Sequence, residues 1–107
     1  MFARVTTVQI AAQRRAHEPT TVDESLEMWR RSVAEVKRSR QGFVEALVLL
    51  DRAHDRVRTI TLWETDEDMR SIEADGLYTA LTHEFADAIS EPPVIEHFEV
   101  GMRLTRE

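Results

Sequence analysis

The sequence of 107 residues has no cysteine, no asparagine, and only three glycines and three prolines. Without cysteine, the chain forms no disulfide and offers no thiol for nucleophilic or metal chemistry. Without asparagine, any mechanism that requires this carboxamide is closed to it. The three glycines are widely separated, so they form no glycine-rich loop for binding phosphate.

Long apolar runs are missing as well. No stretch approaches the roughly 18 apolar residues that span a bilayer, and Met1–Val5 lacks the apolar core of a signal peptide. We therefore expect no membrane association and a cytoplasmic location. The formal net charge of −6 argues against nucleic-acid binding, which depends on Lys and Arg to neutralise phosphates.

The sequence contains a series of predicted strands and helices over 1–107, the length of a single domain. Residues rich in Val, Ile, Thr and aromatic side chains predict strands over 2–10, 43–50, 57–64 and 94–104. Apolar residues at helical spacing predict a helix that begins near the Thr21–Glu24 capping box and ends near Arg40. A second helical region begins after its Thr65 cap, is broken at Asp75-Gly76, and ends before Pro92.

This β-α-β-β-α-β order is typical of an α+β, ferredoxin-like fold with an antiparallel four-stranded sheet. Its two helices cover only one face of the sheet. The strand over 43–50 is apolar on both sides, with Phe43, Leu47 and Leu49 on one face and Val44, Ala46, Val48 and Leu50 on the other. Such a strand needs cover on both faces. We therefore expect a homodimer packed sheet against sheet; the alternative is a monomer with an amphiphilic open face.

Several segments carry a family resemblance: the opening strand Phe2–Val8, Gly42-Phe43, Leu62-Trp63-Glu64-Thr65 before an acidic helix start, and Pro92-Pro93 before the last strand. With the element order, they resemble the antibiotic-biosynthesis monooxygenase (ABM) family of the dimeric α/β-barrel superfamily. The resemblance covers nearly the whole chain. It implies a homodimer with a cavity in each subunit between the sheet and the helices. Members include cofactor-independent oxygenases of polycyclic phenols, quinol oxygenases and haem-degrading enzymes.

The chain departs from this family at two positions. The phenol oxygenases and the haem degraders both pair the strand Trp with an Asn. In the haem degraders this Asn lies near the first strand, at a position that Thr6 or Thr7 occupies here. Haem degraders carry a ligand His about ten residues after the Trp, where this sequence has Glu73. The resemblance therefore implies that neither haem nor another cofactor is bound.

Trp63 is the leading candidate for a site residue. The alternation of a strand places it on one face with Thr59, Thr61 and Thr65, a mixed surface suited to an aromatic ligand with a polar edge. Tyr78 lies at the edge of an apolar helix face, so that its hydroxyl could reach a cavity. The predicted substrate-binding residues are Thr6, Thr7, Thr61, Trp63 and Tyr78, and Trp63 is also the catalytic candidate. The alternatives are a core Trp63 that anchors the strand and a Tyr78 that only packs.

Charged residues give weaker signals. Arg4 shares a strand face with Thr6 and needs a charged partner or a ligand anion if it points inward. His97 and Glu99 share a face of the last strand, but two ligands are too few for a metal site, and no metal is expected. We interpret His97, Glu99 and Arg103 as a polar ladder at the sheet rim or the dimer seam.

The sequence thus leads to two hypotheses. In the first, the chain is a cofactor-independent monooxygenase-like enzyme that acts on an aromatic or quinol-type small molecule, which loses a proton and reacts with oxygen directly. In the second, it is a non-catalytic homodimer of the same fold that binds a small apolar or aromatic ligand or serves a structural role. The missing asparagine favours the second hypothesis.

Overall fold

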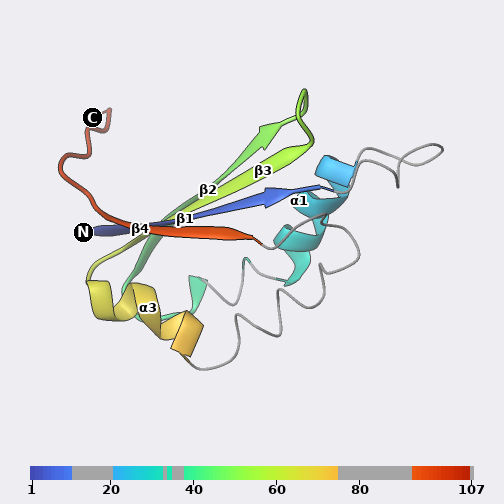
Figure 1. Ribbon diagram of the computed structural model, residues 1–107. Helices are drawn as coiled ribbons and strands as arrows, with labels where there is room; N and C mark the ends of the chain where they lie inside the picture. The colour runs from blue at the N-terminus through green and yellow to red at the C-terminus, as the bar shows by residue number, and fades with distance from the viewer. Residues whose placement is uncertain (11–20, 33, 35–37, 75–92, 107) are drawn as a thin grey trace.

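The computed structural model describes residues 1–10, 21–32, 34, 38–74 and 93–106. In this part of the chain a four-stranded sheet carries two helices on one face (Figure 1). The elements are β1 (Phe2–Gln9), α1 (Thr21–Ser32), β2 (Phe43–Asp51), β3 (Arg56–Trp63), α3 (Asp66–Ala74) and β4 (Val94–Glu99). The sheet order is β2-β3-β1-β4, and every pair of neighbours is antiparallel. The predicted ferredoxin-like β-α-β-β-α-β fold is therefore confirmed.

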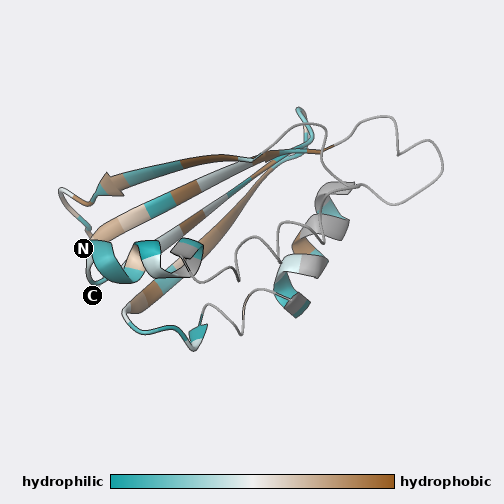
Figure 2. Cartoon of the chain, turned by 60° about the horizontal axis from the view of Figure 1, so that its bottom comes forward, coloured by the Kyte–Doolittle hydropathy of each residue, from teal (hydrophilic) through white to brown (hydrophobic). Residues whose placement is uncertain are grey.

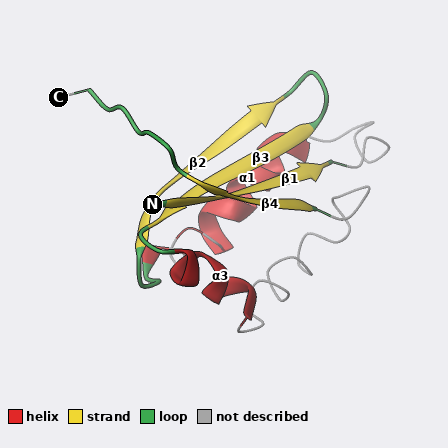
Figure 3. Cartoon of the chain, turned by 60° about the vertical axis from the view of Figure 1, so that its left-hand side comes forward, coloured by secondary structure: helices red, strands yellow, loops and turns green. Residues whose placement is uncertain are grey.

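The two helices divide the covered face of the sheet between them. α1 packs on β2 and β3, whereas α3 packs on β1 and β3, and Figure 3 shows both on the same side of the sheet. Near the β2–β3 hairpin the core is apolar, built from Ile10 and Val57 with Val8, Val48 and Leu50 around them. At the opposite end, where α3 packs on the sheet, the largest buried side chains are Trp63, Arg4, Met69 and Thr61. The most deeply buried polar residues of the described core, Arg4 and Thr61, therefore lie at the α3 end, and Thr59, one row nearer the hairpin, is buried as well.

α3 begins where the sequence predicts. The backbone N–H of Asp68 donates a hydrogen bond of 3.0 Å to the Thr65 hydroxyl, which satisfies one of the free donors of the first turn. Asp66, Glu67 and Asp68 place negative charge at the positive end of the helix dipole. The predicted cap is confirmed, and it fixes α3 directly after β3.

A β-bulge changes one of the predicted strand faces. The register of β2 against β3 shifts between Phe43 and Glu45, so Phe43 lies opposite Trp63 on the helix-covered face. The two rings meet edge to face, with centroids 5.6 Å apart and planes at 79°. The prediction that Phe43 shares a face with Leu47 and Leu49 is therefore wrong, because the bulge inserts one residue into the alternation.

The last strand is shorter than predicted. β4 ends at Glu99, and residues 100–106 run past the sheet without strand structure (Figures 1 and 3). Arg103 forms an ion pair with Glu45 of β2. The predicted ladder of His97, Glu99 and Arg103 is thus not formed, because Arg103 lies beyond the strand and bonds elsewhere.

The uncovered face of the sheet is apolar at its edges. Pairing across the strands places the open-face residues in rows. Figure 2, seen from the side of the helices, shows that apolar residues recur along each strand. Four large apolar side chains on this face are about half exposed: Leu47, Leu49, Val94 and Phe98. Within the described residues, no helix is long and apolar enough to cross a bilayer.

Candidate functional site

The polar residues beneath α3 form a line across three strands. Arg4 of β1 pairs with His97 of β4 on one side and with Thr61 of β3 on the other. Residues paired across neighbouring strands have Cβ atoms about 5 Å apart. We call His97, Arg4 and Thr61 the polar row. It lies on the helix-covered face, where the core of a small domain would ordinarily be apolar.

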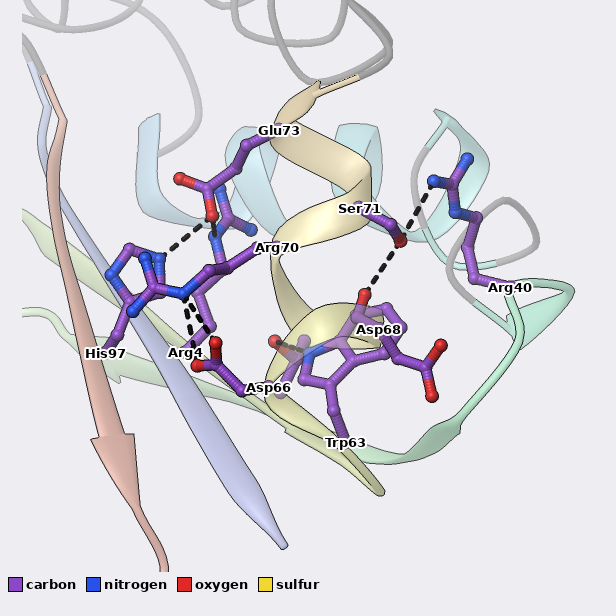
Figure 4. Close-up of polar contacts among 10 residues, drawn as sticks. Arg4, Arg40, Trp63, Asp66, Asp68, Arg70, Ser71, Glu73 and His97 are labelled. Atoms are coloured by element: carbon purple, nitrogen blue, oxygen red, sulfur yellow. Dashed lines mark hydrogen bonds and ion pairs between the residues drawn. The ribbon is translucent and has the colours of Figure 1, made fainter.

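Glu73 of α3 reaches down to the polar row. Its Oε2 lies 2.9 Å from His97 Nε2 and 3.6 Å from Arg4 Nε (Figure 4). A buried guanidinium is stable only when its charge is compensated, and this carboxylate compensates it. One carboxylate oxygen is thus shared between a histidine and an arginine that come from different strands.

Burial changes along the polar row. Arg4 and Thr61 are each 1% exposed, whereas the side chains of His97 and Glu73 are 22% and 28% exposed. His97 lies on β4, an edge strand of the sheet. Solvent therefore reaches the polar row from the β4 edge, and the row becomes dry toward Thr61.

Trp63 closes the dry end of the row. The indole is fully buried, and its N–H donates a hydrogen bond of 3.0 Å to the Thr61 hydroxyl. A threonine hydroxyl that accepts this bond still has its own proton to donate. In this arrangement the indole N–H is satisfied inside the protein, and the remaining hydroxyl proton at this end belongs to Thr61.

The predicted substrate-binding residues fall into three groups. Thr61 and Trp63 lie together at the polar row, and Thr6 lies on the same face, in the next row, paired with Thr59 and Ile95. Thr7 lies on the open face of the sheet, because neighbouring residues of a strand point to opposite sides. Tyr78 lies outside the described residues. The structure thus brings three of the five residues onto one face.

Sequence reasoning missed the pairing of His97 with Glu73. Alternation along β4 placed His97 on one face correctly, yet nothing in the sequence said that this face lies under α3 or that Glu73 points toward it. Arg4 was the available signal, since a buried arginine requires a carboxylate and an acidic residue on a covering helix can supply one. The described part of the chain contains no group of three or more His, Asp or Glu residues placed to bind a metal ion.

No protein-family model and no curated protein matches this sequence. Solved structures do match over nearly the full chain. A monooxygenase from Streptomyces coelicolor, in complex with nanaomycin D, is 21% identical with a TM-score of 0.76; the match covers 98% of this chain and 92% of that one. A protein described as an antibiotic biosynthesis monooxygenase from Deinococcus radiodurans is 15% identical with a TM-score of 0.75, covering 100% and 99%.

A third similar structure is SnoaB, a cofactor-independent oxygenase from Streptomyces nogalater. It is 15% identical with a TM-score of 0.73, and the match covers 98% of this chain and 97% of that one. These identities establish a common fold. The resemblance predicted from the sequence is therefore confirmed at the level of the fold.

Proposed function

We propose that this chain is a cofactor-independent monooxygenase-like enzyme that acts on an aromatic or quinol-type small molecule. One observation carries the proposal: the polar row with Glu73 lies on the helix-covered face of an ABM-like fold, and among these four residues only His97 and Glu73 are partly exposed. A satisfied core would bury apolar residues at these positions, so a buried arginine beside a histidine that is 22% exposed calls for a purpose beyond packing.

The chemistry needs little from the protein. An electron-rich phenol or quinol loses a proton, and its anion transfers an electron to oxygen directly. For a ring CH2 group activated in this way, one oxygen atom of O2 replaces both hydrogens, and the other oxygen atom leaves with them as water. This balance requires no external reductant. The protein contributes a dry site with oriented donors, where charge interactions are stronger than in water.

Each predicted residue has a place in this proposal. Thr61 donates its hydroxyl proton to a polar edge of the substrate, and Thr6 lines the same face one row away. Trp63 forms the apolar wall and, as the catalytic candidate, shapes the site around the reacting ring. Tyr78 and Thr7 stay in the proposal as substrate contacts; because Thr7 lies on the open face, its contact would be at the boundary between the two subunits.

The proposed enzyme is a homodimer in which the open face of each sheet covers that of the other. Phe98 and Leu47 are each 49% exposed on this face in the single chain. Burying one such side chain fully contributes about 1.5–3 kcal/mol, and a two-fold interface counts every contact twice. Half-exposed apolar residues on both edge strands therefore favour a second copy as their cover.

Sedimentation equilibrium tests the dimer. Leu47→Asp places two charges in a two-fold interface and is expected to raise the dissociation constant by at least about a hundredfold, or roughly 3 kcal/mol. Ala53→Asp is the matched control, because Ala53 is exposed in the β2–β3 turn. A wild-type chain that stays monomeric and folded at high concentration would contradict the dimer.

A second candidate function is a non-catalytic homodimer that binds a small apolar or aromatic ligand. The observation in its favour is that the Trp63 N–H is already bonded to Thr61, so the indole offers a ligand no donor. The missing asparagine removes a further donor. Ligand binding without turnover would be the signature of this alternative.

Oxygen uptake separates the two candidates. Pure protein is incubated in air with a panel of naphthohydroquinones, anthrones and catechols, and uptake is compared with buffer alone. The enzyme proposal predicts uptake above buffer with at least one compound, reduced by Trp63→Phe. Trp29→Phe is the control, because Trp29 lies on α1 rather than beside the polar row. Uptake equal to buffer across the whole panel would remove the enzyme and leave the alternative.

A further inference from the structure

The open face of the sheet consists of three rows of paired residues. Each row runs from β4 at one edge, through β1 and β3, to β2 at the other edge. The first row, at the end where β1 begins, holds Phe98, Ala3, Leu62 and Glu45. The second row holds Glu96, Val5, Ile60 and Leu47, and the third row holds Val94, Thr7, Arg58 and Leu49.

The segment after β4 crosses the open face at the first row. The chain leaves β4 at one edge of the sheet, and Arg103 then forms an ion pair with Glu45 of β2 at the other edge. Figure 3 shows this segment leaving the sheet on the side away from the helices. The two central residues of the first row, Ala3 and Leu62, are already buried in the single chain. The second and third rows, with Phe98 at the β4 edge, are therefore the part of the open face that a partner can cover.

The second and third rows carry one acidic and one basic side chain. Glu96 of β4 and Arg58 of β3 are both exposed, and within the described residues neither side chain forms an ion pair or a hydrogen bond. The two positions lie two strands and one row apart, which is about 10 Å across the strands and about 7 Å along them. Opposite charges at separate places on an otherwise apolar surface can be matched by a second copy of that surface.

A two-fold axis can exchange the positions of the two charges. When two identical sheets pack face to face, the axis lies between them and runs parallel to both. We consider an axis that crosses β1 midway between Val5 and Thr7, perpendicular to the line that joins Glu96 to Arg58. This axis places Glu96 of each copy over Arg58 of the other copy. The contact therefore forms twice, as in every two-fold interface.

The same rotation also matches apolar residues with apolar residues. With strands about 4.8 Å apart and rows about 7 Å apart, it brings Ile60 over the partner's Val5 and Leu49 beside the partner's Phe98. Leu49 and Phe98 are each about half exposed in the single chain, so the contact removes apolar surface of both from water. Charges and apolar side chains therefore favour the same axis, and no charge has to be buried against an apolar side chain.

We propose that the open faces of two copies associate about this axis, with an ion pair between Glu96 of each copy and Arg58 of the other. The inference rests on the homodimer of the proposed function, and it supplies the orientation of the two subunits. Apolar contacts are non-directional, so they allow several orientations of one sheet on the other. Charge pairs suppress the orientations that set like charges together, and this pair selects one of them.

Charge reversal tests the pair by sedimentation equilibrium. Glu96→Arg sets two arginines against each other at both contacts, and Arg58→Glu does the same with two glutamates. Each variant should raise the dissociation constant at least about thirtyfold, or about 2 kcal/mol. Glu67→Arg on α3 and Arg31→Glu on α1 are matched controls, because both residues are exposed on helices that cover the opposite face. Both controls should keep the wild-type value, and circular dichroism checks that every variant is folded.

Mixing the two variants shows whether the pair joins different chains. At a concentration where each variant alone is monomeric, an equimolar mixture of Glu96→Arg and Arg58→Glu should form a heterodimer with about the wild-type dissociation constant. Both contacts of this heterodimer join an arginine to a glutamate. A pair within one chain would instead be restored by the double variant and not by mixing. A mixture that stays monomeric, or single variants that dimerise like wild type, would overturn the proposal.

The outcomes separate this inference from the proposed function. A wild-type dimer that Leu47→Asp dissociates and that neither charge reversal affects would keep the homodimer and remove the pair. A monomeric wild type would remove both. Recovery of the dimer on mixing, without oxygen uptake for any compound of the panel, would support the pair and remove the enzyme.

Discussion

Glu73→Gln offers the clearest test of how the buried arginine is stabilised. The substitution keeps the shape of the side chain and removes its charge, so Arg4 stays buried at 1% exposure without the carboxylate 3.6 Å away. Breaking a fully buried pair costs about 3–5 kcal/mol. Because Glu73 is 28% exposed and the contact is long, solvent screening reduces the expected loss to about 2 kcal/mol.

The assay is urea unfolding followed by tryptophan fluorescence at one fixed protein concentration, since a dimer makes apparent stability depend on concentration. Glu27→Gln is the matched control, because Glu27 pairs with Arg30 at 2.9 Å on the exposed face of α1. This helix pair contributes about 0.3–0.5 kcal/mol. Arg4→Met combined with Glu73→Gln should recover most of the loss, because it removes the buried charge as well. Equal losses for Glu73→Gln and Glu27→Gln would refute the reasoning.

Three further predictions concern the stability of the fold, each measured by urea unfolding. Thr65→Ala removes the hydroxyl that accepts the hydrogen bond from the Asp68 backbone N–H and should cost about 1 kcal/mol, whereas Thr65→Ser should cost little. Gly42→Ala should cost at least about 1–2 kcal/mol, because Gly42 has φ +80° and its new Cβ would meet the Asp68 carboxylate. The hydrogen bond from His54, and then that from Arg56, lowers the pKa of Asp51 below its ordinary 3.8. The ionised Asp51 should therefore stabilise the folded state fully above that pH, and this stabilisation should be lost as the pH falls through the lowered pKa. Asp51→Asn should abolish this part of the pH dependence.

Much of the fold could be predicted because each element has a local cause. Thr65 and the acidic residues after it start α3 by capping, which depends only on neighbours in sequence. Strand alternation likewise placed Thr59, Thr61 and Trp63 on one face, as the register confirms. Local rules of this kind need no knowledge of the tertiary packing.

The errors arose where partners come from distant segments. The bulge at Phe43 depends on how β2 pairs with β3, and alternation alone placed Phe43 on the wrong face. The end of β4 at Glu99 depends on where pairing with β1 ends. The contact between Glu73 and His97 joins a helix and a strand 24 residues apart, so it requires the rotation of α3 on the sheet. Sequence patterns give periodicity, but they do not give this rotation.

The central claim is that the polar row beneath α3 belongs to a site that consumes oxygen. The most direct measurement is oxygen uptake by the pure protein with the panel of naphthohydroquinones, anthrones and catechols. The account predicts uptake above buffer with at least one compound, reduced by Trp63→Phe and unchanged by Trp29→Phe. Uptake equal to buffer across the panel, or equal losses in the two variants, would contradict it.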